Sequence, residues 1–391
     1  MSGSARLIHV AAWARTTGGV ETLLARHARS DPRAGYDAWQ VGLFDRRPPG
    51  ADDRFVPLRF SWHRTPRGMR AAMAALFARH PAALTVWHNG WGLPWFADVD
   101  ASRRRIACLV DAESQFGPLL AAAAPWLDGV TCLCEEAARA IRRIAPALAA
   151  DGRVVVTPLP VAPGVPDPGP RPPGGDEWVI GCAGRLVRAQ KRWDRLVPFV
   201  RALRARGARF RVEIVSDGPL RPWLQRQFAG DAAVQFLGWQ DPIGYRRRMR
   251  RWDAAVFFSD HEGGPIVMLE AMAEGALPFY PAIGGSLGDE YAPQVEPRCL
   301  YPAADPCAAA AAVHAVLSEP PGVVARLRER ARALAARHEP GAYDAACRAF
   351  FQHVDALPRR SLEPRAGRAP RLSDYFPLGW LTRFWPRALL R

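Results

Sequence analysis

The stretch Ser259–Gly275, SDHEGGPIVMLEAMAEG, decides how the second half of the chain folds. It follows residues 253–258, DAAVFF, an apolar run that predicts a buried strand. Gly263 and Gly264 then allow a tight turn, and Pro265 suits the first position of a helix. The stretch therefore predicts a strand, a glycine turn and a helix in immediate succession.

Polar groups gather around that turn. The first amides of the predicted helix, Ile266 and Val267 among them, lack partners within the helix and so favour an anion. Glu262 precedes the helix, and Glu270 lies one turn beyond Ile266 on the same face. Two carboxylates therefore flank a position suited to phosphate, where they can accept hydrogen bonds from hydroxyl groups.

The segment Glu262–Glu270, EGGPIVMLE, resembles the E-x7-E motif of retaining glycosyltransferases with the GT-B fold, specifically glycosyltransferase family four, the glycosyl transferases group 1. The resemblance implies a nucleotide-sugar donor, with Glu262 on a hydroxyl of the sugar and Glu270 on the ribose hydroxyls. The alternative is an ordinary strand–loop–helix unit with glutamates on its solvent side.

A second segment of the same family follows a predicted strand at residues 178–183. Gly184–Arg192, GRLVRAQKR, resembles the family segment G-R-L-x-x-x-K, with one extra residue before the lysine. Arg185 can bind phosphate oxygens as a planar fork, and Lys191 can act as a compact charge on a flexible stem. The alternative is two solvated cations near the start of a helix. Gly238 ends VQFLG, which resembles the family's F-L-G strand end beside the nucleotide base.

The first half alternates apolar runs with helical stretches. Gly18 and Gly19 follow an opening strand at residues 6–13, and this turn resembles the family's G-G-x-E segment, whose loop faces the donor. Further strands are predicted at residues 38–44, 84–87, 106–110 and 130–133. Strands that alternate with helices predict a parallel, doubly wound sheet.

Two residues that end strands are candidates on the acceptor side. His88 follows one strand, and Asp111 ends another near the place where the family usually has a histidine that touches the donor sugar. Because the residue type differs there, only proximity carries over to Asp111. Asp98 and Asp100 match the D-x-D metal motif of the other glycosyltransferase fold, but nothing around them supports a metal site.

Length and composition predict two domains of a cytoplasmic protein. The chain has 391 residues, more than one core usually organises, and 49% of them are hydrophobic. It has no run of 18 apolar residues, no basic-then-apolar leader, and seven cysteines without paired C-x-x-C spacing. We therefore expect reduced thiols and no transmembrane helix.

Proline marks the boundary between the domains. Residues 158–173 contain eight prolines in sixteen positions, which predicts an extended linker. We expect an N-terminal Rossmann-like, acceptor-side domain at residues 1–160, a linker at 161–176 and a nucleotide-sugar-binding domain at 177–340. The two domains are expected to face a cleft, with a C-terminal helix and a basic, aromatic tail at 341–391.

The charge balance favours an anionic partner. The formal net charge is +15, and Lys191 is the only lysine. In the tail, residues 371–391 contain four arginines with Tyr375, Phe376, Trp380, Phe384 and Trp385. Aromatic rings beside cations suit the interface of a membrane. They equally suit a tail that packs back on the first domain.

The resemblance implies a retaining hexosyltransferase that moves a sugar from its nucleotide to a glycan or lipid-linked acceptor, in bacterial cell-surface polysaccharide synthesis. Arg185, Lys191 and Glu262 would be catalytic, and no metal, other cofactor or nucleic acid is expected. We expect action in the cytoplasm, at the inner face of the membrane. Two alternatives are a nucleotide-sugar epimerase of the same fold and a non-catalytic, basic membrane-binding protein.

Overall fold

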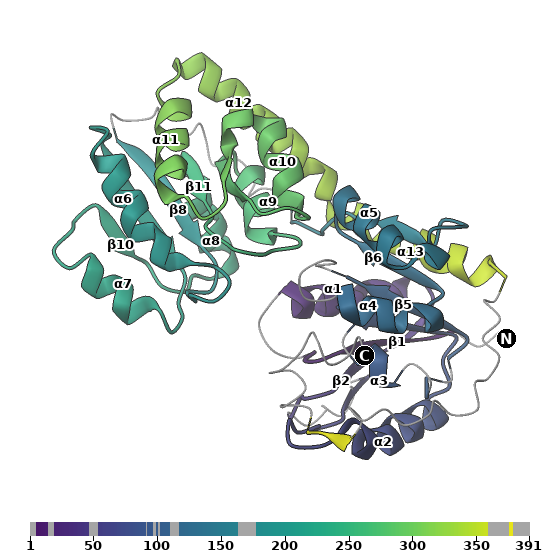
Figure 1. The fold of residues 1–391 in the computed structure, drawn as a ribbon. Coiled ribbons are helices and arrows are strands. Elements are labelled where there is room, and N and C mark those ends of the chain that lie inside the picture. Colours follow the sequence, from purple (N-terminus) through teal and green to yellow (C-terminus); the bar gives the residue numbers. More distant parts are fainter. Residues whose placement is uncertain are drawn as a thin grey trace. The chain divides into compact units, whose positions relative to one another are not determined.

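The structure is a computed structural model that describes residues 5–14, 19–46, 54–90, 92–96, 99–100, 102–109, 117–162, 177–358 and 375–377. The chain divides into two compact units (Figure 1). Unit 1 comprises Met1–Thr157 with Asp344–Arg391, and unit 2 comprises Pro158–Tyr343. Unit 2 is therefore continuous in sequence, whereas unit 1 is completed by the end of the chain.

The described part of unit 1 is built on a seven-stranded parallel sheet with the order β3-β2-β1-β4-β5-β6-β7. Its strands are β1 (Arg6–Ala11), β2 (Asp37–Gly42), β3 (Phe55–Pro57), β4 (Leu84–His88), β5 (Arg104–Cys108), β6 (Gly129–Cys132) and β7 (Val154–Val156). Its helices are α1 (Gly19–Arg33), α2 (Pro66–Arg79), α3 (Leu93–Phe96), α4 (Gly117–Ala123), α5 (Glu135–Ile144) and most of α13 (Pro340–Ala356). All five residues of β4 are buried, as expected of a parallel strand covered on both faces.

Unit 2 contains, in its described part, a six-stranded parallel sheet with the order β10-β9-β8-β11-β12-β13. Its strands are β8 (Trp178–Ala183), β9 (Phe210–Val215), β10 (Val234–Phe236), β11 (Ala254–Val256), β12 (Leu277–Ala282) and β13 (Leu300–Pro302). Its helices are α6 (Leu196–Arg204), α7 (Arg221–Gln227), α8 (Pro242–Met249), α9 (Ile266–Ala273), α10 (Leu287–Val295), α11 (Pro306–Leu317) and α12 (Pro321–Ala335). Helix α6 packs against α11, and α9 packs against α8 and α12. The prediction of two doubly wound α/β units is confirmed.

A glycine in the central strand of unit 2 makes room for a buried tryptophan. A Cβ at Gly181 would collide with the indole of Trp252, which lies directly over the strand. The indole Nε1 donates to the carboxylate of Glu213, on neighbouring β9, at 3.0 Å. The sheet and the segment before β11 are thereby fixed to each other.

The two units divide between Thr157 and Pro158, within the proline-rich segment. Leu159 and Val161 bind His338 of the same unit: the Leu159 amide donates to Nδ1 at 2.9 Å, and the Val161 amide donates to the carbonyl at 2.8 Å. Burial lowers the pKa of His338 to about 4, so its Nδ1 remains an acceptor at neutral pH. The first residues after Pro158 are thus held by unit 2, and residues 163–176 lie outside the described ranges.

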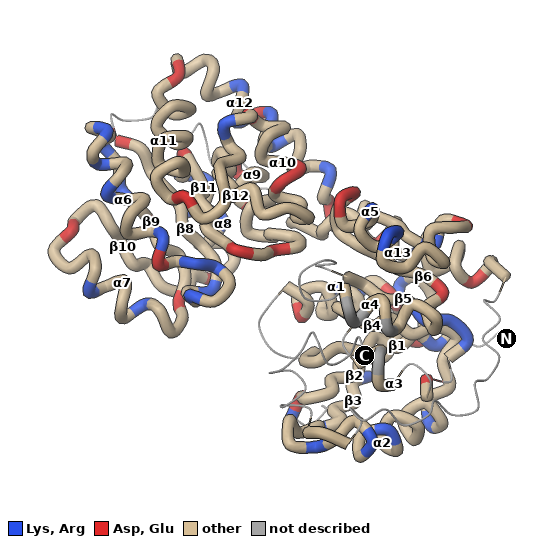
Figure 2. Tube along the Cα trace, in the orientation of Figure 1, with Lys and Arg blue, Asp and Glu red and all other residues tan. Residues whose placement is uncertain are grey.

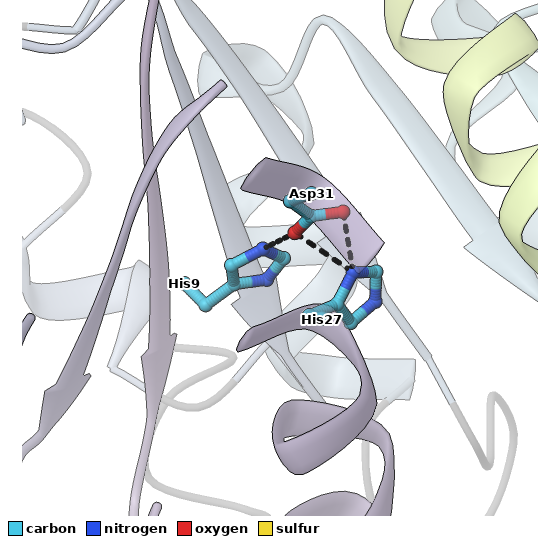
Figure 3. A group of neighbouring side chains, drawn as sticks. All are labelled: His9, His27 and Asp31. Carbon is cyan, nitrogen blue, oxygen red and sulfur yellow. Dashed lines mark hydrogen bonds and ion pairs between the residues drawn. The ribbon is translucent and has the colours of Figure 1, made fainter. Parts of the chain in front are cut away.

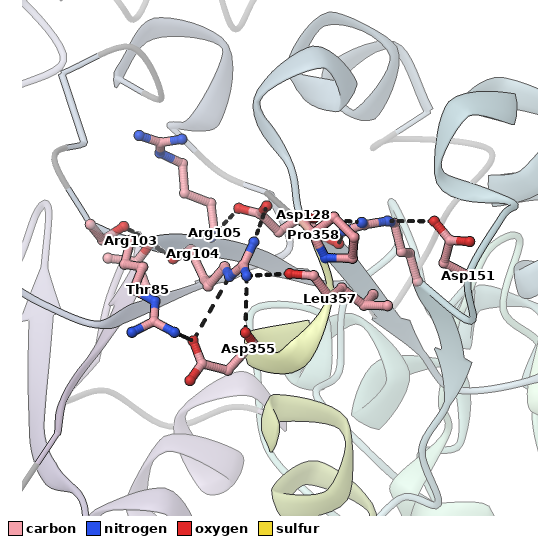
Figure 4. Close-up of polar contacts among 11 residues, drawn as sticks. Thr85, Arg103, Arg104, Arg105, Asp128, Asp151, Asp355, Leu357 and Pro358 are labelled. Atoms are coloured by element: carbon pink, nitrogen blue, oxygen red, sulfur yellow. Dashed lines mark hydrogen bonds and ion pairs between the residues drawn. The ribbon is translucent and has the colours of Figure 1, made fainter. Parts of the chain in front are cut away.

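Helix α13 is anchored to the sheet of unit 1 through Arg104, the first residue of β5 (Figure 4), and Arg153, which directly precedes β7. The Arg104 guanidinium donates to the carbonyl of Asp355 at 2.9 Å and also to that of Leu357. Arg153 donates to the carbonyl of Pro358 at 3.0 Å. These hydrogen bonds provide donors for the backbone carbonyls at the end of α13, which have no partner within the helix.

The described part of the tail is Tyr375–Pro377. The Arg67 guanidinium, on α2, lies 5.1 Å from the centre of the Tyr375 ring and donates to its hydroxyl at 2.6 Å. Trp380, Phe384 and Trp385 lie outside the described residues.

No single helix in the described ranges is long and apolar enough to cross a membrane. One pair, Pro306–Leu317 with Pro321–Ala356, meets the length and composition criteria together and is bent by 113°.

Candidate active site

The predicted site residues of unit 2 meet where two central strands end. Strands β8 and β11 are neighbours, and the chain leaves β8 toward β9 on one side but leaves β11 toward β12 on the other. Ligands of open α/β sheets bind at such a reversal, outside the carboxyl ends of the strands. Arg185 and Lys191 lie on the loop after β8, and Glu262 lies on the loop after β11.

The loop after β8 is fixed by its backbone. Gly184 has a φ of 119°, a conformation that favours glycine. The chain at Gly218 passes so near this loop that a Cβ there would lie 2.6 Å from the carbonyl oxygen of Leu186. The carbonyl of Arg185 accepts a hydrogen bond from the Trp193 indole at 3.1 Å. The guanidinium of Arg185 is exposed and has no hydrogen-bond or ion-pair partner among the described residues.

Lys191 and Glu262 form an ion pair across the two loops. From the sequence, Lys191 is expected to bind phosphate and Glu262 a hydroxyl, without contact between them. In the structure, the ammonium donates to Oε1 of Glu262, and the Ser259 hydroxyl donates to the same oxygen at 2.7 Å. The Glu262 side chain is only 8% exposed, so these two donors replace most of its hydration.

A second ionic contact joins the same loops, and the sequence analysis missed it. Asp260 accepts from Arg192 at 2.8 Å and from Arg195 at 2.6 Å, and its amide donates to the Gln190 carbonyl at 2.9 Å. Burial opposes ionisation of Asp260, but the two arginines outweigh it and lower the pKa. Its position just after strand β11, beside Glu262, is the sequence signal that could have identified it.

The glycine turn before α9 differs in one respect from the prediction. The Ile266 amide is not free, because it donates to the Gly264 carbonyl at 2.9 Å. The Val267 amide donates to no described residue. The Gly263 carbonyl accepts from the Leu287 amide at 2.9 Å, which ties the turn to the start of α10. The helix therefore offers Val267, but not Ile266, as a free donor at this end.

Glu270 lies one turn into α9 and has a perturbed pKa. Burial raises the pKa of its carboxyl to about 7, although the nearby Arg246 cation and a hydrogen bond from the Tyr245 hydroxyl act in the opposite direction. Arg246 is itself buried and forms an ion pair with Glu274 at 2.8 Å. Its positive charge is therefore shared between Glu274 and Glu270. Near pH 7, Glu270 is therefore divided between its ionised and protonated forms.

The remaining glycines of the predicted site lie at different places. Gly238 follows β10, two strands away from β8 at the same edge of the sheet, with a φ of 67°. Gly19 is the first residue of α1 in unit 1. Gly18 and Asp111 lie outside the described residues.

His88 and Asp100, the polar candidates of unit 1 that the structure describes, are buried. His88 is 2% exposed, and its Nε2 lies 3.0 Å from Nδ1 of His9. Asp100 is 1% exposed and accepts from Thr85 at 2.6 Å and from the Trp87 indole at 3.0 Å. These bonds give Asp100 a structural role in the core. Asp98 is outside the described residues.

Positive charge is distributed over many elements of both units. Figure 2 shows arginines on α2, α7 and α12, among others, in the described part of the chain. The net charge of +15 therefore does not by itself locate a binding site. The site is distinguished instead by two cations on one loop at the strand reversal: Lys191, which is ion-paired, and Arg185, which is exposed and has no partner in the described part of the chain.

Comparison with known proteins agrees with this geometry. The family profile described as Glycosyl transferases group 1 matches residues 177–319, which include all the site residues of unit 2. No curated protein matches the sequence significantly.

Similar solved structures cover both units. They include a glycosyltransferase from Rickettsia africae (12% identity, 91% of this chain and 100% of that chain, TM-score 0.68) and Anabaena HepE in complex with UDP-glucose (16%, 90% and 100%, TM-score 0.66). A third is sucrose-phosphate synthase from Thermosynechococcus elongatus (17%, 89% and 99%, TM-score 0.66). At these identities the likeness concerns the fold, while the profile match concerns the sequence of unit 2. Together they show a glycosyl transferases group 1 domain at residues 177–319, in a chain whose two units share the fold of GT-B glycosyltransferases.

Proposed function

We propose that the protein transfers a hexose from a nucleotide-diphosphate sugar to a glycan or lipid-linked acceptor, with retention of configuration, in the synthesis of a bacterial cell-surface polysaccharide. The observation that carries the proposal is the ion pair of Lys191 and Glu262 at the reversal of strand order, on a loop shared with Arg185, whose guanidinium has no partner among the described residues. Anabaena HepE, a similar structure, is a complex with UDP-glucose, which supports a nucleotide sugar as the donor.

The chemistry follows from the charges that the reaction creates. When the bond between the anomeric carbon and the diphosphate breaks, negative charge grows on the phosphate. We assign Arg185, Lys191 and the Val267 amide as donors to it, and one such donor is typically worth about a hundred- to a thousandfold in rate. An ammonium has three protons to donate, so Lys191 can keep Glu262 while turning toward the phosphate. Two cations at one diphosphate support chemistry without a divalent metal at this site.

The acceptor is expected to attack from the face that the diphosphate leaves. Its oxygen bonds to the anomeric carbon, and its proton passes to an oxygen of the leaving phosphate, which accounts for retention without an enzyme nucleophile. Glu262 then holds a hydroxyl of the sugar, and Glu270 holds the ribose hydroxyls.

The proposal is tested by hydrolysis of the donor, in which water takes the place of the unidentified acceptor. Candidate nucleotide sugars are first screened by thermal shift, since a ligand at a hundred times its dissociation constant stabilises by about 2.7 kcal/mol. The binder is then followed by NMR, and we expect slow release of nucleoside diphosphate and of sugar in the donor's own anomeric form. Release of the opposite anomer would contradict retention, and an isomeric nucleotide sugar without free diphosphate would indicate an epimerase.

The metal requirement is tested in the same assay. After treatment with chelator, addition of Mg²⁺ or Mn²⁺ is expected to leave the rate unchanged. A rate that depends on either ion would contradict the two-cation mechanism.

A further inference from the structure

Unit 1 contains a polar cluster in its core that the proposed reaction does not use. The histidine cluster consists of His9, His27, Asp31 and His88, whose exposed fractions are 1%, 2%, 6% and 2%. Nε2 of His9 lies 2.8 Å from Oδ2 of Asp31, and Nδ1 of His27 lies 3.1 Å from the same oxygen. Burying three imidazoles and a carboxylate is costly unless each polar atom gains a partner.

The chain brings these side chains together from three elements of unit 1, and Figure 3 shows His9, His27 and Asp31. His27 and Asp31 are four residues apart on α1 and therefore lie on one face of the helix. His9 lies on β1, the strand that α1 follows, and points toward that face. His88 ends β4, the neighbour of β1 in the sheet.

The separations of the two histidine nitrogens from Asp31 suit a small, nitrogen-binding cation. His9, His27 and Asp31 each offer one atom, and these atoms all lie within 4.8 Å of one another. Tetrahedral Zn²⁺, with bonds of about 2.0–2.1 Å, holds its ligand atoms roughly 3.3 Å apart. The separations from Asp31, 2.8 Å and 3.1 Å, need to widen by only a few tenths of an ångström.

The surroundings of His9 match those of a metal ligand. A histidine that binds a metal through one nitrogen usually donates the other N–H to an outer partner. Nδ1 of His9 lies 3.0 Å from Nε2 of His88, which can accept that proton. The remaining nitrogen of His88, Nδ1, is buried without a hydrogen-bond partner among the described residues. Because this nitrogen lacks a partner, His88 is not part of a fully satisfied hydrogen-bond network. We assign it the role of orienting His9.

We infer that His9, His27 and Asp31 form a zinc site that joins α1 to β1 in the core of unit 1. Two imidazoles favour Zn²⁺ over Mg²⁺ or Ca²⁺, and three protein ligands leave a fourth position for water. The site lies in unit 1, whereas the cations proposed to act on the diphosphate lie in unit 2. The proposed reaction gives no role to a metal, so the zinc site is an additional property of unit 1.

The test measures metal content directly. The full chain, freed of any affinity tag, is stripped with chelator, given equimolar Zn²⁺, desalted and analysed by atomic emission. We expect about one zinc ion per chain, and visible bands of tetrahedral coordination when Co²⁺ replaces Zn²⁺. Asp31→Asn and His27→Gln should each lower zinc occupancy about tenfold or more, because each removes a direct ligand.

His353→Gln is the matched control. His353 is an exposed histidine of the same unit, bonded to the Asp151 carbonyl at 2.7 Å, and its variant should retain the zinc. Circular dichroism checks that each variant is folded. If a variant is unfolded, the zinc content and cobalt spectrum of the wild-type protein decide whether the site exists. Wild-type protein without stoichiometric zinc, an octahedral cobalt spectrum, or occupancy unchanged in both ligand variants would overturn the site and leave a hydrogen-bonded core cluster. None of these results depends on glycosyl transfer.

Discussion

Lys191 and Glu262 lie 71 residues apart in sequence, yet their side chains form the central contact of the candidate site. Replacing Lys191 by alanine removes a cation that is proposed to meet the leaving phosphate. It also leaves the nearly buried Glu262 carboxylate with Ser259 as its remaining side-chain donor in the described region. We expect turnover of Lys191→Ala to fall by about a hundredfold while the fold persists. Steady-state kinetics and the melting temperature check this.

Arg188→Ala is the control for that experiment. Arg188 lies on the same loop, but its guanidinium stacks over the Trp223 ring, 5.1 Å from its centre. Its removal takes away one positive charge without touching the ion pair, so turnover should stay within about threefold. A folded Lys191→Ala protein with wild-type turnover would rule out the phosphate role of the lysine.

The raised pKa of Glu270 leads to a prediction of how the affinity for the donor depends on pH. Its pKa of about 7 means that the ionised form, the better acceptor for ribose hydroxyls, declines as the pH falls through 7. The affinity for a nucleotide sugar, whose diphosphate does not titrate in this range, should weaken by up to about tenfold from pH 8 to pH 6. Calorimetry at several pH values measures this. In Glu270→Gln the affinity should be lower but independent of pH; a wild-type affinity that is flat across the range would contradict the assignment.

At the residue scale, sequence patterns predict which residues line the site better than they predict the contacts between those residues. Glycine turns and the two glutamates at fixed spacing predict which residues line the loops. The partner of each charge depends on where separate loops end in space, so the pairing of Lys191 with Glu262 and of Asp260 with two arginines could not be predicted. The i, i+4 spacing of His27 and Asp31 is visible in the sequence, but the contribution of His9 requires the fold.

At the scale of elements, the sheet of unit 2 depends on close packing at Gly181. Because a Cβ there would enter the Trp252 ring, Gly181→Ala must displace either the strand or the indole. Overpacking of this kind costs about 1–3 kcal/mol in the free energy of unfolding. Chemical denaturation followed by tryptophan fluorescence measures the change.

Gly322→Ala is the control: it makes the same chemical change, but it is expected to raise the free energy of unfolding. Gly322 lies in the first turn of α12, where the nearest atom to an added Cβ is the flexible end of Arg326 at 3.8 Å. Alanine should stabilise the helix by up to about 1 kcal/mol. Equal effects of the two substitutions would mean that the Trp252 contact does not control stability.

The elements themselves were largely predictable, because parallel strands buried on both faces appear as continuous apolar runs between helical stretches. The start of α9 shows the limit of that approach. A proline after two glycines predicts a helix start, but it does not reveal that the Ile266 amide turns back onto Gly264. Such details depend on backbone angles that residue types only bias.

At the scale of the whole molecule, we predict that the tail binds a membrane. Residues 371–391 combine four arginines with five aromatic residues, and each cation near an anionic surface contributes about 1 kcal/mol. Truncation after Pro370 should abolish sedimentation with anionic vesicles and leave the melting temperature unchanged. Vesicles of neutral lipid are the control, since binding to them should be weaker.

The contact of Tyr375 with Arg67 supports the competing explanation, in which the tail packs on unit 1. In that case truncation should lower the melting temperature, and the full chain should not sediment with vesicles. That combination would refute the membrane role. Replacing Arg67 by alanine in the full chain then isolates the contribution of the one contact that the structure describes.

The return of α13 to unit 1 has a consequence for the order of events on the ribosome. Arg104 and Arg153 are synthesised before unit 2, but the carbonyls that they bind, at Asp355, Leu357 and Pro358, emerge only after it. Unit 2 is continuous, so it can complete its core while unit 1 still lacks a helix. We therefore expect the nascent N-terminal half to keep apolar surface uncovered until α13 has been synthesised, and to be open to chaperones during that time.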